Sequence, residues 1–375
     1  MEVAIVGAGL LGSAAAWALA SRGVRPLVLE QFGLGHTRGS SHGATRIFRL
    51  SYPEPAYVRM AMAARPAWAR LQAAAGEELL ITTGGLDAGP GAEVCAAALA
   101  ECGAAHSWLT ASQVRGRFPG IAAQPGERML YQPDSGVCLA GRTVAALQRL
   151  AEQQGADIRA DCPVLAIEPN GDRAVVRTAT GPVSATVVVA AAGPWSGRLL
   201  AGAVSQPPRL AVTRQQVRYF RPRDSRPAAW PTFIEWPAGA PVWYLVPMLG
   251  GAPGIKVATH APGPLADPGD VPSAGTDPAV DEQAADYVRD RLPGLDPAPL
   301  LPETCLYTLT ADEDFVLGRE GPVVAAAGCS GHAFKFGPLL GEILAALALG
   351  EPPPVDLTRF SLARQALASA PLAGT

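Results

Sequence analysis

The chain has 375 residues, of which 49% are apolar and 17% are charged, and its formal net charge is −3. This length predicts two domains, or one large interrupted domain, with ample apolar content for a sizeable core. The slightly acidic balance and the lack of basic blocks argue against nucleic acid or an anionic membrane as the main partner, so small-molecule chemistry is expected.

Cysteine usage and apolar runs bear on the compartment. The cysteines have neither CxxC spacing nor the density of a disulfide scaffold, so no metal is expected and a reducing cytoplasm is predicted. Residues 3–20 are uncharged, but Glu2 supplies no positive n-region and glycines interrupt the stretch, which argues against a signal peptide or a membrane span. The six cysteines are Cys95, Cys102, Cys138, Cys162, Cys305 and Cys329.

The first residues carry the pattern of a dinucleotide site. Val3–Val6 is predicted to be a short buried strand, and an alanine-rich helix is predicted to run to about residue 21. In the intervening turn GAGLLG, Gly7 permits the tight bend, Gly9 lets a pyrophosphate approach the backbone, and Gly12 lets helix and strand pack closely. The pattern therefore predicts a nucleotide at the N-terminus of this helix.

An acid follows the second predicted strand. Residues 26–29 form that strand, and Glu30 lies eighteen positions after Gly12, where a carboxylate can bond the ribose hydroxyls. An ordinary glycine-rich turn would not explain this acid. The motif alone does not distinguish FAD from NAD.

Later segments predict further elements around the same sheet. Asn170 and Gly171 predict a hairpin turn between strands 164–167 and 174–177. Buried strands that end in small residues predict that the chain returns to the nucleotide sheet. Asp277 and Pro278 predict the start of a scaffolding helix. The strands are predicted at residues 155–158, 185–193 and 322–328, and the helices at residues 142–154, 277–292 and 338–349.

Two other parts of the chain are richer in Trp, Tyr, Pro and irregular strands. They predict a second, sheet-bearing domain that is inserted twice into the nucleotide-binding domain. The fold class is therefore α/β, with a Rossmann-like domain and an interleaved α+β substrate domain whose sheet is mostly antiparallel. The nucleotide-binding domain is predicted at residues 1–80, 144–205 and 308–375, and the substrate domain at residues 81–143 and 206–307.

Only two of the thirty basic residues are lysines, Lys256 and Lys335. Generic cations in this chain are arginines, so the lysines are expected where a compact ammonium that can shift its pKa is required. Both lie in suggestive surroundings, one in the apolar run GIKVATH at 254–260 and the other in GHAFKFG at 331–337. The alternative is compositional, in which lysine has been lost generally and two remain by accident.

Three stretches, together with the nucleotide motif, resemble the monomeric sarcosine oxidase and N-methyltryptophan oxidase family of FAD-dependent amine oxidases. The resemblance spans nearly the whole chain, and it implies that the Rossmann-like domain is an FAD-binding domain of the glutathione reductase type. The stretches are GSSHGATRIFR at 39–49, CLYTLTADEDF at 305–315 and GHAFKFG at 331–337.

The resemblance implies which residues hold the cofactor. Cys305, in its Cys-x-Tyr-Thr context, matches the cysteine that carries FAD through a thioether, although a free cysteine is more often a small buried hydrophobe. His42 and Arg46 match positions beside the flavin, where a cation stabilises electron density on the ring. Further cofactor contacts are implied for Ser41, Thr45, Val164, Gly331, Phe334 and Lys335.

The resemblance also implies a substrate site. Arg49 and Lys335 match the cations that hold the substrate carboxylate, and a fork and a point charge on one carboxylate would fix its orientation. A surface salt bridge is the alternative for Arg49. Lys256 matches the lysine near flavin N5 that promotes the reaction with oxygen, because a fixed ammonium stabilises superoxide as it forms.

Three further pocket residues follow from the same match. They are His260, Tyr244 and Tyr307. Alternation along a strand would place Lys256 and His260 on one face. A histidine on an apolar face is more often structural, so His260 depends mainly on the resemblance. The sequence does not choose between His260 and a tyrosine as the group that tunes deprotonation of the substrate amine.

The implied reaction is oxidation of an amino acid with a secondary amine to an imine, with oxygen reduced to hydrogen peroxide. The expected partners are therefore a small amino acid and oxygen, and the expected enzyme is a cytoplasmic monomer. One alternative is an oxidase of a cyclic imino acid such as pipecolate or proline, in secondary metabolism. Alternatives of a different class are flavin or nicotinamide dehydrogenases that do not use oxygen.

Several departures from the family pattern border the expected pocket. Ala44 stands where relatives often have an acid, Cys329 replaces an aromatic residue and Ala333 replaces a glycine, and the loop at 248–254 is one residue longer than in sarcosine oxidases. These changes put sarcosine itself in doubt as the substrate. A larger pocket lined by tryptophans is one possibility, although core packing is their commoner role. The tryptophans are Trp230, Trp236 and Trp243.

Overall fold

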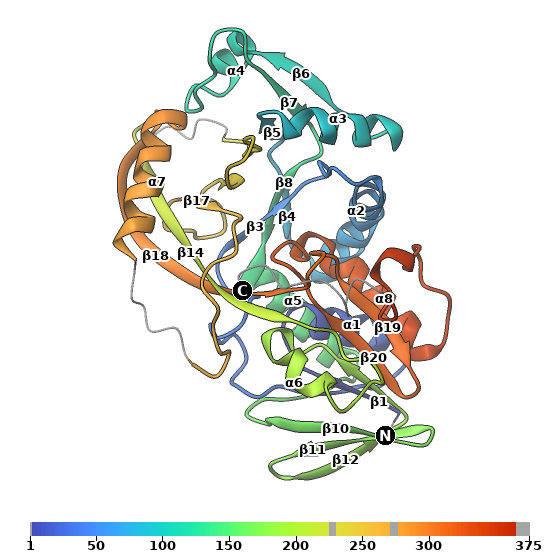
Figure 1. The fold of residues 1–375 in the computed structure, drawn as a ribbon. Coiled ribbons are helices and arrows are strands. Elements are labelled where there is room, and N and C mark those ends of the chain that lie inside the picture. The colour runs from blue at the N-terminus through green and yellow to red at the C-terminus, as the bar shows by residue number, and fades with distance from the viewer. Residues whose placement is uncertain (1, 225–229, 271–276, 365–375) are drawn as a thin grey trace.

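The computed structural model describes residues 2–224, 230–270 and 277–364. Two large sheets dominate these residues. In Figure 1 the six-stranded sheet lies in the lower half of the molecule, and the eight-stranded sheet runs from the left side to the top. This arrangement confirms the predicted α/β fold class, with one largely parallel and one largely antiparallel sheet.

The six-stranded sheet has the order β19-β20-β13-β1-β2-β9, and its strands are parallel except for the edge strand β19. Its central strands are short and fully buried, as expected for a sheet covered on both faces. The strands are β1 (Val3–Val6), β2 (Leu27–Leu29), β9 (Asp157–Arg159), β13 (Val187–Ala190), β19 (Val316–Glu320) and β20 (Val323–Ala327).

Alternate residues of β1 face two different cores. Val3 and Ile5 belong to the core shared with the helices, and Ala4 and Val6 belong to the core on the other face. The helical face is covered by α1 (Leu10–Ala20), α2 (Pro55–Ala75), α5 (Ala140–Gln153) and α8 (Gly337–Leu349). The other face is covered by α6 (Ser196–Leu200) and by a meander of β10 (Val164–Asn170), β11 (Arg173–Thr178) and β12 (Gly181–Ala185), which projects at the bottom of Figure 1.

The predicted hairpin is present, but its turn lies one residue further along. Asn170 pairs with Arg173, so the two-residue loop consists of Gly171 and Asp172 and not of Asn170 and Gly171. Gly171 has a φ of +63°, which glycine adopts without strain. Asn170 is therefore the last strand residue.

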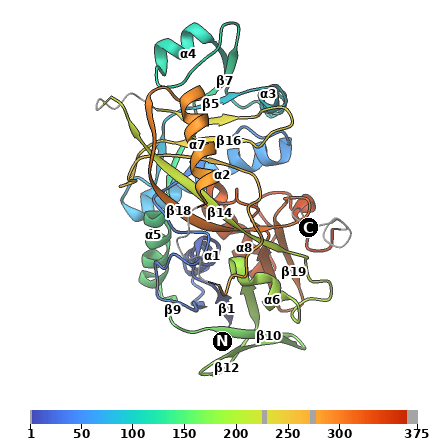
Figure 2. The same ribbon diagram turned by 60° about the vertical axis from the view of Figure 1, so that its left-hand side comes forward.

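The eight-stranded sheet has the order β18-β14-β17-β16-β15-β5-β7-β6 and is antiparallel except for the β15–β5 pair. Figure 2 shows α7 (Pro278–Arg291) lying beside β14 and β18. Asp277 accepts a hydrogen bond from Ala279 N at 3.0 Å, so this helix begins at its predicted cap. The strands are β5 (Gly85–Ala88), β6 (Ser107–Thr110), β7 (Arg128–Gln132), β14 (Ala211–Pro222), β15 (Thr232–Glu235), β16 (Trp243–Val246), β17 (Ile255–Thr259) and β18 (Leu295–Leu309).

A three-stranded sheet of order β3-β8-β4 complicates the predicted domain boundaries. Both predicted insertions contribute strands to the eight-stranded sheet, as a double insertion requires. However, β8 lies in a predicted insertion and pairs with β3 and β4, so the boundaries themselves stay a prediction, and residues 365–375 of the last segment lie outside the described residues. The remaining elements are β3 (Thr45–Phe48), β4 (Leu80–Thr82), β8 (Gly136–Leu139), α3 (Gly91–Glu101), α4 (Ala111–Arg117) and the 3₁₀ turns Gly193–Trp195, Phe334–Phe336 and Thr358–Phe360.

Length and hydropathy of the helices bear on membrane insertion. Within residues 2–224, 230–270 and 277–364, every helix is too short or too polar to cross a bilayer.

Candidate active site

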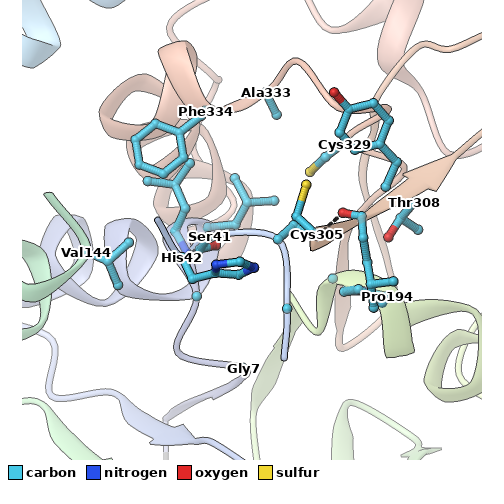
Figure 3. A pocket seen from close by; sticks show the side chains of 18 of the residues that line it. Gly7, Ser41, His42, Val144, Pro194, Cys305, Thr308, Cys329, Ala333 and Phe334 are labelled. Atoms are coloured by element: carbon cyan, nitrogen blue, oxygen red, sulfur yellow. Dashed lines mark hydrogen bonds between the residues drawn. The ribbon is translucent and has the colours of Figure 1, made fainter. Parts of the chain in front are cut away.

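A cavity of about 730 Å³ extends from the glycine turn after β1 to the face of the eight-stranded sheet. Figure 3 shows Ser41, His42, Phe334, Cys305 and Cys329 around one space, although they come from segments far apart in the sequence. Gly12 is the one predicted site residue that does not line the cavity. Those that do are Gly7, Gly9, Glu30, Ser41, His42, Thr45, Arg46, Arg49, Val164, Tyr244, Lys256, His260, Cys305, Tyr307, Gly331, Phe334 and Lys335.

The glycine turn leaves no room for side chains. Gly7 has a φ of +98°, and a Cβ there would lie 2.6 Å from Ala191 O. A Cβ on Gly12 would lie 1.8 Å from Gly7 O, so this residue sets how closely α1 packs on β1. A Cβ on Gly9 would narrow the cavity beside Ser41 Oγ, at 3.1 Å. The turn therefore forms a bare backbone cradle of the kind that a pyrophosphate needs.

Glu30 lies at the end of β2 with 5% of its surface exposed. Its carboxylate accepts hydrogen bonds from Ala8 N at 2.8 Å and Phe32 N at 3.0 Å, and His36 Nε2 lies 3.3 Å away. Burial alone would raise the pKa of this carboxyl, but His36 and the two backbone N–H groups hold the pKa below its ordinary value. The acid at the predicted ribose position is therefore ionised and fixed.

Three polar atoms of cavity-lining residues fit a bound cofactor. His42 Nε2, Thr45 Oγ1 and Thr308 Oγ1 are buried and have no hydrogen-bond partner among the described residues. Buried polar atoms normally have a partner, and an orphan in a cavity wall indicates a ligand or water. A dinucleotide with polar ring edges would satisfy them, and the backbone cradle would hold its phosphates.

Arg46 organises the loop at the middle of the cavity. Its guanidinium donates to the carbonyl oxygens of Thr45 at 2.8 Å, Ser40 at 3.1 Å and His42 at 2.8 Å. Burial, and then the charge of Arg46, lowers the pKa of His42 to about 4, so this imidazole is neutral at ordinary pH. Arg46 therefore holds the loop together through its hydrogen bonds and also supplies a positive charge beside His42.

Cys305 lies in β18 opposite Gln215 of β14. Cys305 and Cys329 both line the cavity, as Figure 3 shows. Burial raises the pKa of the Cys305 thiol, while the charges of Arg46 and Lys256 act in the opposite direction. Burial is the larger effect, so the pKa is raised overall and the thiol keeps its proton in this structure.

Lys256 is 3% exposed and extends from β17 into the cavity wall. Its Nζ donates to Thr45 O at 3.3 Å and lies 3.5 Å from Glu303 Oε1. Burial, and then the charge of Arg46, lowers the pKa of this lysine to about 8. Glu303 carries no signal of this contact in the sequence, because no local motif marks an acid that meets a lysine on another strand.

Lys335 is 4% exposed, and its Nζ donates to Tyr52 Oη at 2.8 Å and to His332 O at 2.6 Å. Arg49 Cζ lies 3.9 Å from the ring centroid of Tyr52 and 5.1 Å from that of Trp236. Neither cation has a salt bridge with an acid among the described residues. Burial, and then the charge of Arg49, holds the pKa of Lys335 well below its ordinary value.

His260 follows the end of β17, and its Nδ1 lies 3.3 Å from Tyr307 Oη, which is also hydrogen bonded to Tyr244. His260 and Lys256 line the same cavity. Burial, and then Arg49 and Lys335, lowers the pKa of His260 to about 4. Burial also raises the pKa of both tyrosines, so this end of the cavity holds a neutral imidazole beside two protonated phenols.

The tryptophan expectation was wrong for two of its three members. Trp236 lines the cavity, but Trp230 packs against Gly120 and Gly294, and Trp243 stacks on Tyr287 with ring centroids 4.1 Å apart. Both belong to the core under α7. Core packing is favoured there because their large rings fill space between the sheet and the helix.

Comparisons with known proteins agree with this geometry. The model of the FAD dependent oxidoreductase family, DAO, matches residues 2–347. Peroxisomal sarcosine oxidase of Homo sapiens is 35% identical, over 97% of this chain and 96% of the relative, and monomeric sarcosine oxidase of Streptomyces avermitilis is 35% identical over 93% of each. The open form of NikD, described as an unusual amino acid oxidase essential for nikkomycin biosynthesis, superimposes with a TM-score of 0.85 at 29% identity, over 96% of each chain.

The family model spans most of the chain, and the relatives match it nearly end to end. They confirm FAD as the cofactor and exclude the nicotinamide reading of the first motif. The chain therefore belongs to the FAD-dependent oxidoreductase family and, within it, to the sarcosine oxidase group of flavin-dependent amine oxidases, as its sequence predicted.

Proposed function

We propose that the protein oxidises amino acids that carry a secondary amine, converting the C–N bond to an imine and passing the electrons to oxygen to form hydrogen peroxide. The observation that carries this proposal is the pair of cations formed by half-buried Arg49 and buried Lys335, which line the cavity without an acidic partner among the described residues. Relatives whose names state sarcosine oxidation support the substrate class.

Arg49 and Lys335 are proposed to bind the substrate carboxylate. The guanidinium is held by stacking on Tyr52 and Trp236, so less entropy is lost when its fork meets a carboxylate. Lys335 is pushed toward its neutral form by burial and by Arg49, and a bound anion would restore its charge. Binding energy from the carboxylate thus orients the amine end of the substrate.

His260 is proposed to accept a hydrogen bond from the substrate amine. With its pKa near 4, the imidazole is neutral and has a free lone pair on one nitrogen. Tyr307 and Tyr244 keep their protons because burial raises their pKa, and Tyr307 donates to Tyr244. In the imidazole tautomer with its lone pair on Nε2, His260 Nδ1 donates to Tyr307 Oη at 3.3 Å, and Nε2 can accept from the substrate. This arrangement favours His260 over a tyrosine as the group that promotes loss of the amine proton, and it leaves the amine lone pair available for the oxidation.

FAD, when bound, supplies the acceptor for the two substrate electrons and delivers them to oxygen. The residues proposed to hold it are the glycine turn, Glu30, and the cavity-lining set around His42 and Thr45, with Val164, Gly331 and Phe334. Cys305 is proposed to form the covalent attachment. Acid denaturation tests this step: the yellow colour should stay with the wild-type polypeptide and be released from Cys305→Ser. Cys329→Ser removes the other thiol shown in Figure 3 and should retain the colour.

Lys256 is proposed to support the reaction with oxygen, because a fixed ammonium stabilises the negative charge that oxygen gains. Stopped-flow reoxidation of Lys256→Met should be slowed by roughly 10²-fold or more, the scale of losing one preorganised charge. Equal rates in the two proteins would reject this role. A protein that makes no peroxide and reduces a dye instead would be a dehydrogenase that serves another electron acceptor.

A peroxide-coupled screen over N-methyl, cyclic and primary amino acids tests the substrate class. We expect N-methyl amino acids to react best, with cyclic imino acids as the rival substrates. Cys329 and Ala333, two departures from the family pattern, both line the cavity and bear on this choice. Activity with primary amines alone would overturn the proposal.

Assembly and compartment are the last parts of the proposal. A relative named monomeric sarcosine oxidase supports a monomer, which light scattering coupled to size exclusion would test. The six cysteines are free, which supports a reducing compartment, and we propose the cytoplasm. Other relatives are peroxisomal, so imaging of a tagged chain is the direct test.

A further inference from the structure

Glu303 lies in β18, two residues before Cys305, and its side chain meets that of Lys256 in β17 over the intervening strand β14. Its Oε1 is 3.5 Å from Lys256 Nζ, and its Oε2 accepts a 2.7 Å hydrogen bond from Tyr219 Oη. Three neighbouring strands position the group, because Glu303 pairs with Val217 of β14, and Tyr219 pairs with Lys256 of β17. Side chains on adjacent strands of one sheet are held more precisely than side chains on loops.

The carboxylate of Glu303 is also confined on its other side. A Cβ on Gly43 would lie 2.6 Å from Glu303 Oε1, and Gly43 has a φ of +88°. The loop before β3 can therefore approach the acid only with glycine at this position. The side chains of Lys256 and Glu303 are 4% and 22% exposed, so their interaction is screened much less than that of a surface pair.

The surrounding charges make this acid necessary for a charged lysine. Burial and Arg46 both oppose protonation of Lys256, while Glu303 and Cys305 favour it. His42 is neutral, and the Tyr219 and Tyr244 hydroxyls keep their protons because burial raises their pKa. Burial alone would raise the pKa of Glu303, but Lys256, Tyr219 and Arg46 hold it below its ordinary value, so it is ionised. Among the described residues, Glu303 is the acid that forms a salt bridge with Lys256.

We infer that Glu303 is a positioning residue that keeps the Lys256 ammonium charged and fixed in the cavity wall, and so sets the pH range in which it can serve oxygen. The inference rests on the oxygen role proposed for Lys256. A neutral lysine would have no charge with which to stabilise an anion. The acid acts through the lysine, and its loss should appear first as a change in the titration of Lys256.

The scarcity of lysine makes a direct measurement possible. A protein labelled with ¹³C-lysine gives Cε signals from only Lys256 and Lys335, and Lys256→Met assigns them. In Glu303→Gln, which keeps the shape and an acceptor for Tyr219, the titration midpoint of Lys256 should fall by about one pH unit or more, as expected for loss of an opposite charge at this range. The Lys335 signal should not move.

Two further variants keep this test sharp. Glu303→Asp retains the charge but retracts it by one methylene, so it should give an intermediate midpoint. Glu101→Gln is the matched control, because it removes a carboxylate from an exposed pair with Arg59 and should change neither lysine signal. An unchanged Lys256 midpoint in Glu303→Gln would overturn the inference.

Reoxidation after photochemical reduction gives a second readout that needs no amino acid substrate. As the pH rises, the wild-type rate should fall around pH 8, and the Glu303→Gln rate should begin to fall at a lower pH. The two proteins should have equal rates at any pH where Lys256 is charged in both. A loss of equal size at every pH would mean a structural role and overturn the inference. If the Lys256 midpoint moves but Lys256→Met reoxidises normally, the oxygen role is wrong and the charge coupling to Glu303 stands.

Discussion

The two ends of the cavity are built in different ways. The nucleotide end comes from one continuous segment, in which β1, the glycine turn, α1 and β2 bring Gly7 and Glu30 together. The other end, called the catalytic end after its proposed role, is formed by Lys256 from β17, Lys335 from the turn before α8, and Arg49 from the residue after β3. Local sequence therefore specifies the first end, and the packing of distant elements specifies the second.

The electrostatics of the two ends differ in the same sense. Glu30 is ionised and its carboxylate already accepts backbone hydrogen bonds. At the catalytic end, Lys335 is buried and His260 and His332 are half-buried, and desolvation lowers the pKa of each. At neutral pH the two histidines are neutral in the folded and the unfolded chain, so Lys335, whose charged form is disfavoured by burial, is the group among these three that reduces stability there.

The largest effect should come from breaking the nucleotide end at Gly12. Gly12→Val would place side-chain atoms on Gly7 O, where even a Cβ would lie 1.8 Å away. Because that contact is backbone, α1 must move off β1, and we expect a protein without bound FAD or without a folded first domain. Flavin content per chain measures this. Gly116→Val is the control, since a Cβ there meets nothing within 4 Å; normal flavin content in Gly12→Val would contradict the expectation.

What the sequence predicted follows the same division. The bounds of β1 were predicted to the residue, and the predicted acid and glycines lie where the motif required. The two lysines were found because composition made them rare, and the cavity brings both into its wall. These signals are local or compositional, and they need no knowledge of which strands meet.

What the sequence missed depends on contacts between distant segments. Glu303 and Tyr52 each touch a catalytic-end lysine, but nothing near them in the sequence marks that contact. Trp243 differs from Trp236 only in where the fold places it, one in the core and one in the cavity. Pairing across a sheet and packing under a helix decide such cases.

A smaller effect should follow from changing the catalytic end at Lys335. Lys335→Met keeps the length of the side chain and removes its charge, so KM for amino acids should rise by roughly 30-fold or more, the cost of truncating one partner of a buried charge pair. An amine of the same skeleton without a carboxylate should be oxidised nearly as well as before. Equal losses for both substrates would reject a carboxylate site. Reoxidation should be unchanged, in contrast to Lys256→Met.

The smallest effect is a pH dependence of stability that belongs to the catalytic end. Burial lowers the pKa of His42 and His260 to about 4 and holds that of His332 well below its ordinary value. Between pH 6.5 and these values the unfolded chain binds more protons than the folded chain, so stability is present above pH 6.5 and is lost as the pH falls. The Tm of the FAD-free protein should therefore drop between about pH 7 and about pH 5.

His332→Gln isolates one of these histidines. His332 Nδ1 lies 3.2 Å from Tyr52 Oη and Nε2 lies 3.1 Å from Glu313 O, and an amide keeps polar atoms there without titrating. Asp87 and Glu313 have raised pKa values, mainly through burial, and act in the opposite direction, so the slope of unfolding free energy against pH contains several contributions in each protein. Subtracting the slope of His332→Gln from that of the wild type cancels the contributions that the two proteins share. The difference should be positive and at most about 1.4 kcal/mol per pH unit, and a variant as acid-sensitive as the wild type would show that His332 takes up its proton without unfolding.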